Sequence, residues 1–157
     1  MKRIGYLHEQ IYNLQNIDLA DDKARKNKSV RWGIIKHDFN RQQENLELSY
    51  KIRDLVYKTS EYSTFTIYEP KERLIFRLPY YPDRITHHAI MNIMEPIWVN
   101  IFIRQTYSSI RNRGIHLVEY DLKKALTKNP DRTKYCLKMD IKKFYPSINH
   151  DILFEII

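Results

Sequence analysis

Glycine, proline and cysteine are scarce in this chain of 157 residues, which contains 3 Gly, 6 Pro and 1 Cys. So little glycine and proline excludes a low-complexity or disordered linker, and hydrophobic residues make up 43%, enough for a packed core. The single cysteine, Cys136, excludes an internal disulfide framework and a cysteine-rich zinc site. Because it lies in an apolar, strand-like run, we expect a buried and unreactive thiol.

Long apolar runs and several familiar site motifs are also missing. No stretch of 18 or more apolar residues occurs, and no signal-peptide pattern follows Met1-Lys2-Arg3, so we expect a cytoplasmic protein without a membrane partner. The histidines show no zinc-binding spacing, and neither a Walker A loop nor a Gly-x-Ser-x-Gly elbow is present.

Acidic residues are outnumbered. Lys and Arg total 27 against 19 Asp and Glu, which gives a formal net charge of +8 and a pI near 9.5. This balance predicts a polyanionic partner, nucleic acid first and an anionic membrane surface second, and the alternative is an ordinary basic protein. The 12 Tyr and 6 Phe favour nucleic acid, because aromatic faces stack on unpaired bases.

Hydrophobic periodicity predicts helices in the first 60 residues, followed by a β-hairpin. Apolar residues at helical spacing favour helices over 5–20 and 38–58, the second with Leu48, Ile52, Leu55 and Val56 on one face. The charged stretch 21–31 is interpreted as a turn or a solvated helix end. Segments 64–69 and 73–78 are rich in β-formers and flank Pro70-Lys71-Glu72, a pattern typical of a hairpin.

Beyond Pro79 the pattern predicts more helices and one further strand. The expected elements are an apolar core stripe from Ile90 to Ile101, in which Pro96 kinks the helix or begins a new one; a helix over 116–127; a turn at Asn129-Pro130-Asp131; a buried strand from Tyr135 to Ile141; and a helix capped by Asn149. Together they predict a mainly helical α+β fold. The last helix reaches Ile157 without a C-cap, so we expect the chain to continue in a longer protein.

The segment from Leu137 to His150 carries the chemistry. Asp140 ends the expected strand, where a carboxylate is well placed to hold Mg²⁺, a hard ion that prefers oxygen ligands. Polymerases use such carboxylates to bind two ions about 3.5–4 Å apart. Taken alone, an Asp at the end of a strand more often forms a turn or caps a helix.

This segment, Leu137-Lys-Met-Asp140-Ile-Lys-Lys-Phe144-Tyr145-Pro-Ser-Ile-Asn-His150, closely resembles the first catalytic block of reverse transcriptases. The bacterial enzymes related to group II introns and diversity-generating retroelements are the most similar, and each fixed position of their pattern matches. The resemblance implies that Asp140 binds both catalytic ions with help from the backbone carbonyl of Ile141. It also implies that Phe144 and Tyr145 belong to the nucleotide site, with Tyr145 excluding a 2′-hydroxyl by steric overlap. The alternative for Tyr145 is an ordinary core aromatic.

Further matches to the family lie upstream, in the expected order and approximate spacing: Arg77-Leu-Pro-Tyr-Tyr-Pro-Asp-Arg-Ile85, Met94-Glu-Pro-Ile97, Thr106-Tyr107 and Arg111-Asn-Arg-Gly-Ile-His116. Relatives often carry an arginine five residues before the first proline of this block, where this chain has Leu74.

Three hairpin cations are therefore candidates for contact with the triphosphate of a nucleotide, namely Lys71, Arg73 and Arg77. Cations there would neutralise the charge that develops on pyrophosphate, and the alternative is a solvated basic face. Asp83 is expected to be structural, and Arg84 either contacts the template backbone or is structural.

We expect a phosphate-contacting turn formed by Arg111, Arg113 and Gly114, in which glycine permits close approach.

The resemblance implies the fingers and the start of the palm of an RNA-directed DNA polymerase. Its partners would be an RNA template, a DNA or RNA primer and dNTPs, with Mg²⁺ as cofactor. The expected divisions are a helical extension over 1–60, fingers over 61–133 and the opening of the palm over 134–157. The Tyr-x-Asp-Asp block of the family is absent, and Asp21-Asp22 lies too early to replace it. We therefore expect residues 1–157 alone to be inactive.

Two alternatives remain at this point. One is a non-catalytic nucleic-acid-binding module with a polymerase-like fold, and the other is a basic helical interaction protein whose motif match is accidental.

Overall fold

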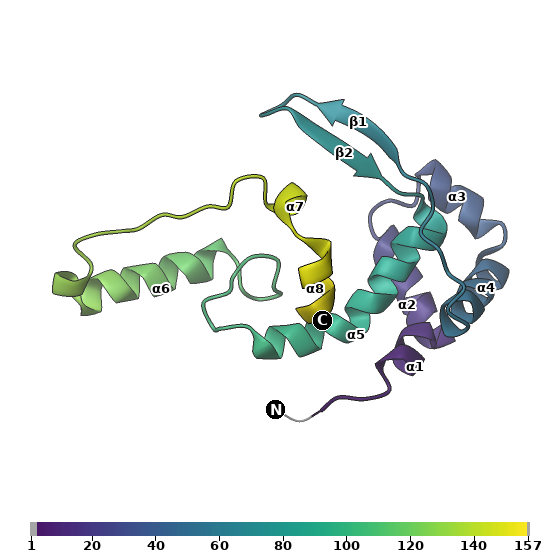
Figure 1. The fold of residues 1–157 in the computed structure, drawn as a ribbon, viewed down its shortest axis with the longest axis horizontal. Helices are drawn as coiled ribbons and strands as arrows, with labels where there is room; N and C mark the ends of the chain where they lie inside the picture. Colours follow the sequence, from purple (N-terminus) through teal and green to yellow (C-terminus); the bar gives the residue numbers. More distant parts are fainter. Residues whose placement is uncertain (1–2, 157) are drawn as a thin grey trace. The chain divides into compact units, whose positions relative to one another are not determined.

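The computed structural model describes residues 3–156, and the chain divides into two compact units, Met1–Phe102 and Ile103–Ile157 (Figure 1). Helices and one two-stranded antiparallel sheet make up the regular structure of these residues. The α+β class expected from the sequence is therefore confirmed at this level. Among residues 3–156, no helix combines the length and the apolar character that crossing a bilayer requires.

Two helices begin the first unit where the sequence pattern predicted one. α1 spans Leu7–Tyr12 and α2 spans Leu14–Arg25, with Asn13 between them. The Asn13 side chain accepts a hydrogen bond of 2.9 Å from the backbone N–H of Gln15, so it caps α2 and ends the preceding helix. The expectation of one continuous helix over 5–20 is therefore wrong.

The next predicted helix, over 38–58, is present but shorter than expected, and a separate helix that the pattern did not predict precedes it. α3 spans Trp32–Asp38 and α4 spans Arg41–Arg53. Leu55 has a left-handed backbone conformation with φ of 56°, which ends the helical path, and its side chain is 80% exposed. Leu55 therefore does not lie on the buried face of α4, contrary to the sequence pattern.

The core of the first unit lies where α2, α4 and α5 meet; α5 spans Ile85–Ile101. Each helix contributes two side chains to this cluster, namely Ile17 and Ala20, Leu48 and Ile52, and Ile85 and Ala89. Burial on α5 is confined to its N-terminal end, and the apolar stripe from Ile90 to Ile101 is only half-buried or exposed. The prediction that this stripe forms the core is wrong, and Pro96 does not begin a new helix.

The predicted hairpin is confirmed. β1 spans Ser63–Ile67 and β2 spans Arg73–Arg77, paired antiparallel so that Ile67 faces Arg73 and Ser63 faces Arg77. Because side chains alternate along a strand, Arg73 and Arg77 project from the same face of the sheet. The polypeptide then turns through Tyr80–Arg84 into α5.

The second unit contains α6 (Ile115–Lys128), a single 3₁₀ turn (Pro130–Arg132), α7 (Phe144–Ser147) and α8 (His150–Ile156). Asn149 caps α8 as predicted, because its side chain accepts hydrogen bonds of 3.0 and 3.2 Å from the backbone of Asp151 and Ile152.

The strand predicted from Tyr135 to Ile141 is not formed. No other strand lies in the described part of this unit, and an isolated strand leaves its backbone N–H and C=O groups without partners. The side chains of Leu137 and Met139 are 80% and 81% exposed, and Cys136 is exposed as well. The expectation of a buried thiol at Cys136 is therefore wrong.

Candidate functional site

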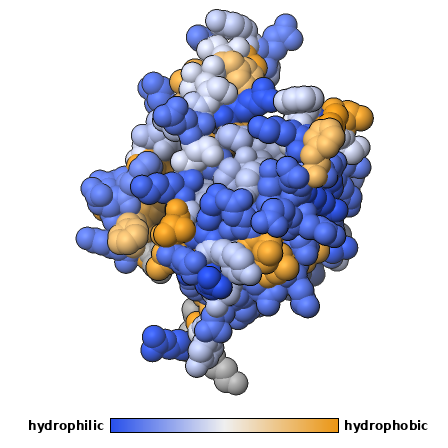
Figure 2. Space-filling view, turned by 90° about the vertical axis from the view of Figure 1, so that its right-hand side faces the viewer, coloured by the Kyte–Doolittle hydropathy of each residue, from blue (hydrophilic) through white to orange (hydrophobic). Residues whose placement is uncertain are grey.

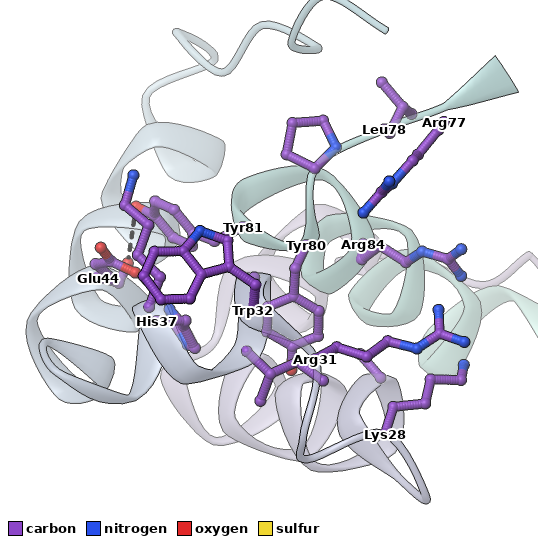
Figure 3. Close-up of a pocket in the computed structure, with 15 residues that line it drawn as sticks. Lys28, Arg31, Trp32, His37, Glu44, Arg77, Leu78, Tyr80, Tyr81 and Arg84 are labelled. Carbon is purple, nitrogen blue, oxygen red and sulfur yellow. Dashed lines mark hydrogen bonds and ion pairs between the residues drawn. The ribbon is translucent and has the colours of Figure 1, made fainter. Parts of the chain in front are cut away.

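A pocket of about 290 Å³ lies in the first unit, between the segment that joins α2 to α3, α3 itself, the end of β2 and the turn Tyr80–Arg84 (Figure 3). Its lining is rich in basic and aromatic side chains and includes a single carboxylate, that of Glu44. The five basic residues are Lys28, Arg31, Lys36, Arg77 and Arg84, and the aromatic ones are Trp32, Tyr80 and Tyr81.

Of the four predicted site residues in the first unit, two line this pocket and two do not. Arg77, at the end of β2, and Arg84, in the turn before α5, both line the pocket. Arg73 lies at the far end of β2, on the same face of the strand as Arg77 but not in the pocket lining. Lys71 is exposed in the loop between the two strands.

A buried carboxylate, that of Asp21, holds the pocket-lining residue Tyr80 in place. Asp21, on α2, has no exposed side-chain surface and receives hydrogen bonds from the guanidinium groups of Arg25, at 2.9 Å, and Arg41, at 2.5 Å. The Tyr80 hydroxyl also donates to it. Burial alone raises the pKa of Asp21, but its His37, Tyr80, Arg25 and Arg41 neighbours together hold that pKa well below its usual value. Stretch 21–31 does contain the end of α2, one of the two expected alternatives, but the expectation of a solvated side chain is wrong for Asp21.

His37 links this network to the pocket. Its Nδ1 pairs with the carboxylate of Glu44, and its Nε2 lies 3.7 Å from Asp21 Oδ1, too long for a hydrogen bond but close enough for charge attraction. Its ring stacks on Tyr81 with centroids 5.3 Å apart. Burial lowers the pKa of His37, but Asp21 and Glu44 outweigh that effect and raise it above its usual value.

Gly33 allows α3 to approach the turn closely. A Cβ atom at this position would lie 3.1 Å from Tyr80 Cβ, tighter than side chains normally pack. The absence of a side chain therefore sets the distance between α3 and Tyr80, and with it the shape of this wall of the pocket.

Asp83 fixes the turn from the opposite side. It is fully buried and accepts hydrogen bonds from the Tyr57 hydroxyl at 2.7 Å and from the Ser60 backbone N–H at 3.0 Å. Burial raises the pKa of Asp83, but these hydrogen bonds prevail and lower it. Asp83 ties the segment before β1 to the start of α5, so the predicted structural role is confirmed.

The residues predicted around the catalytic carboxylate lie in the second unit. Asp140 and Ile141 are exposed and belong to no helix or strand. Phe144 and Tyr145 begin α7 with their rings edge to face, 5.2 Å between centroids, and the Tyr145 side chain is 81% exposed. Within residues 3–156, no cluster of three or more His, Cys, Asp or Glu side chains is assembled that would hold a metal ion.

The predicted phosphate-contacting turn also lies in the second unit, immediately before α6. Arg111 is exposed, and Arg113 donates a weak hydrogen bond of 3.4 Å to the backbone carbonyl of Thr106. Gly114 precedes α6 with an extended backbone, and nothing lies within 4 Å of the position its Cβ would occupy. The space beside Gly114 is therefore open.

Sequence reasoning missed the contribution of Lys28, Arg31, Trp32 and Lys36, which the pattern placed in or beside a solvated stretch. The available signal was a tryptophan directly after a run of basic residues, a combination typical of surfaces that bind nucleic acid. On the face shown in Figure 2, hydrophilic side chains predominate and apolar residues form only small separate patches. This face therefore offers no broad apolar docking surface.

Compared with known proteins, the chain matches no protein-family model, and no curated protein matches it.

Proposed function

We propose that this chain provides the fingers and the opening of the palm of an RNA-directed DNA polymerase. The observation that carries the proposal is the segment from Leu137 to His150, which agrees with the first catalytic block of reverse transcriptases at each fixed position. In this proposal, Asp140 is the carboxylate that binds the catalytic ions, and Tyr145 selects the sugar of the incoming nucleotide.

Mg²⁺ suits the oxygen donors of this segment. The Asp140 carboxylate and the Ile141 backbone carbonyl are hard ligands on exposed residues. Within residues 3–156, the Asp140 carboxylate forms no ion pair. When bound, the ions supply charge stabilisation for the attacking and leaving oxygens of nucleotidyl transfer. Asp140 is one carboxylate, so we propose that a second carboxylate-bearing segment outside residues 1–157 completes the site.

The hairpin supports the same proposal through its charge. Arg73 and Arg77 project from one face of β2, and neither forms an ion pair with a carboxylate in the described residues. Two unpaired guanidinium groups on one face suit a polyphosphate, which accepts hydrogen bonds in a bidentate manner. They are the residues to which we assign the triphosphate of the incoming nucleotide.

Primer extension on an RNA template with Mg²⁺ and dNTPs tests this function. The samples are the product of the complete gene, its Asp140→Ala variant, and residues 1–157 alone. We expect extension by the first and none by the third. Loss of Asp140 should lower the rate at least about a thousandfold, equivalent to about 4 kcal/mol of transition-state stabilisation.

Asp131→Ala is the matched control, because Asp131 is an exposed carboxylate of the same unit, 3.5 Å from Lys134. This variant should extend primers at the wild-type rate. Activity that survives Asp140→Ala would show that the catalytic assignment is wrong.

A second function is favoured by the location of the basic pocket, which is built wholly from the first unit and needs none of the residues around Asp140. Such a chain would serve as a non-catalytic nucleic-acid-binding module. The complete gene product would then bind nucleic acid but extend no primer on any template tested.

A further inference from the structure

The pocket of the first unit combines two features that polyanionic ligands with flat rings require. Figure 3 shows the charged ends of Lys28, Arg31, Arg77 and Arg84 on one side of it, and the indole of Trp32 on the other. Lys28 and Arg31 come from the segment between α2 and α3, whereas Arg77 and Arg84 come from more than forty positions later in the chain. The fold, rather than a local run of basic residues, therefore creates this cluster.

The cations of the pocket are available to a ligand. Within residues 3–156, none of the five lining Lys and Arg side chains forms an ion pair. Arg25 and Arg41, which do not line the pocket, pair with Asp21. The one lining carboxylate, that of Glu44, is engaged by His37. The positive charge of the rim therefore lacks a counter-charge from the protein.

The pKa of His88 is affected by the same positive charges. Burial lowers the pKa of His88, and the positive charges of Lys28, Arg84 and Lys23 lower it further. Cations that disfavour a further positive charge on His88 attract an anion to the same region.

Trp32 supplies the second feature. Its side chain is 75% exposed, although an indole gains free energy from burial, and it stands at the start of α3 on the rim of the pocket. Beneath the rim, Tyr80 and Tyr81 are held by hydrogen bonds to Asp21 and to the Glu44 backbone carbonyl, at 3.1 Å. The open aromatic face of Trp32 beside unpaired cations is suited to stack on an unpaired base whose phosphates lie on the cations.

We infer that this pocket binds a single strand of nucleic acid, with an unpaired base on Trp32 and backbone phosphates on Lys28, Arg31 and Arg84. A free nucleotide fits less well, because small-ligand sites bury most of their ligand and this aromatic face is open to solvent. A duplex fits less well because its bases are already stacked on one another. The inference goes beyond the proposed polymerase function and requires neither Asp140 nor Mg²⁺.

Fluorescence anisotropy tests this site. A labelled oligouridylate of about 10 nucleotides is titrated with the protein of residues 1–157. Trp32→Ala should weaken binding about fivefold or more, because one base loses its stacking partner. Arg31→Glu should weaken binding by a similar factor and lower the slope of log affinity against log salt by about 0.7 or more. Both side chains are exposed, so unchanged circular dichroism spectra are expected.

Lys58→Glu is the matched control. Lys58 is an exposed cation of the same unit that lies outside the pocket, and its replacement changes the net charge by the same amount as Arg31→Glu. This variant should keep wild-type affinity. Asp140→Ala should also bind as the wild type does, so a failure of the polymerase proposal and a failure of this one give different results.

Direct contact with the indole is measured in a Trp98→Phe background, where Trp32 is the sole tryptophan. We expect the oligonucleotide to quench its fluorescence. Tighter binding of oligouridylate than of oligodeoxythymidylate assigns the site to RNA, and the reverse order assigns it to DNA. Either order supports binding of a single strand in the pocket. Wild-type affinity in both Trp32→Ala and Arg31→Glu would overturn the inference. So would tighter binding of a dNTP, of an RNA duplex of equal length, or of anionic phospholipid vesicles.

Discussion

Asp21 shows how one residue holds three segments of the first unit together. Its carboxylate, on α2, accepts hydrogen bonds from Arg25 on the same helix and from Arg41 on α4. It also accepts a hydrogen bond from the hydroxyl of Tyr80, in the turn before α5. Removing one partner from a buried ionic network leaves the others without compensation.

Asp21→Asn should therefore lower the free energy of unfolding by about 3 kcal/mol, measured by urea denaturation monitored by circular dichroism. Asp22→Asn is the control, because Asp22 has a side chain that is 63% exposed and pairs with Arg41 at the surface. Its effect should stay below about 1 kcal/mol. Equal losses in the two variants would contradict a special role for the buried carboxylate.

His37 gives the first unit a pH dependence whose sign follows from its surroundings. The groups that face it are Asp21, Glu44, Tyr80 and Tyr81, and the two carboxylates raise its pKa above the ordinary value of 6.5. A raised pKa in the folded state stabilises the protein fully below the unfolded-state pKa, and this stability is lost as pH rises through the folded-state pKa.

The free energy of unfolding should accordingly fall as pH increases above about 6.5, by about 1.4 kcal/mol for each unit by which the folded-state pKa is raised. His37→Gln should remove this slope, whereas His116→Gln, at an exposed position of α6, should leave it unchanged. Urea titrations between about pH 5 and pH 8 measure it. Asp21 acts in the opposite direction, since its lowered pKa gives stability that is lost in acid. A slope that persists in His37→Gln would assign the pH dependence to another group.

At the scale of elements, local patterns predicted what local forces decide. The β-hairpin follows from two β-forming segments around a short polar loop, and α6 from an amphipathic repeat, and both are present. The capping role of Asn149 was also predictable, since a side chain and two nearby backbone N–H groups suffice. The expected strand from Tyr135 to Ile141 depends on a partner, which the described residues do not provide.

The candidate site was predictable only in part, for a related reason. Arg77 and Arg84 were found through a family motif in their own stretch of sequence, but their neighbours Lys28, Arg31 and Trp32 lie far upstream. Apolar periodicity does not report that α3 packs beside the turn before α5, a contact that depends on the missing side chain of Gly33. Asp21 looked like a solvated charge because three of its four partners, Arg41, Tyr80 and His37, come from other elements.

At the scale of the whole molecule, burial is distributed unequally. Every buried residue among those described lies in the first unit, and none of residues 103–156 is buried. Helix stability in proteins comes mainly from packing an apolar face, and α6 leaves Leu122 and Leu126 57% and 46% exposed. The free energy that opposes local opening should therefore be much larger in the first unit than in the second.

Hydrogen exchange of residues 1–157, followed by mass spectrometry, measures this difference. Backbone amides of α2, α4 and the N-terminal half of α5 should exchange slowest, because they open only with the core around Ile17 and Leu48. Amides of α6 and α8 should exchange at the earliest times, since they open without exposing buried apolar surface.

Oligouridylate should slow exchange around Arg31 and in the turn Tyr80–Arg84 while leaving α6 and α8 unchanged, because the proposed strand site belongs to the first unit alone. Strong protection of α6 or α8 in the free chain would mean that the second unit has a core of its own, and slowing confined to that unit would move the strand-binding site away from the pocket.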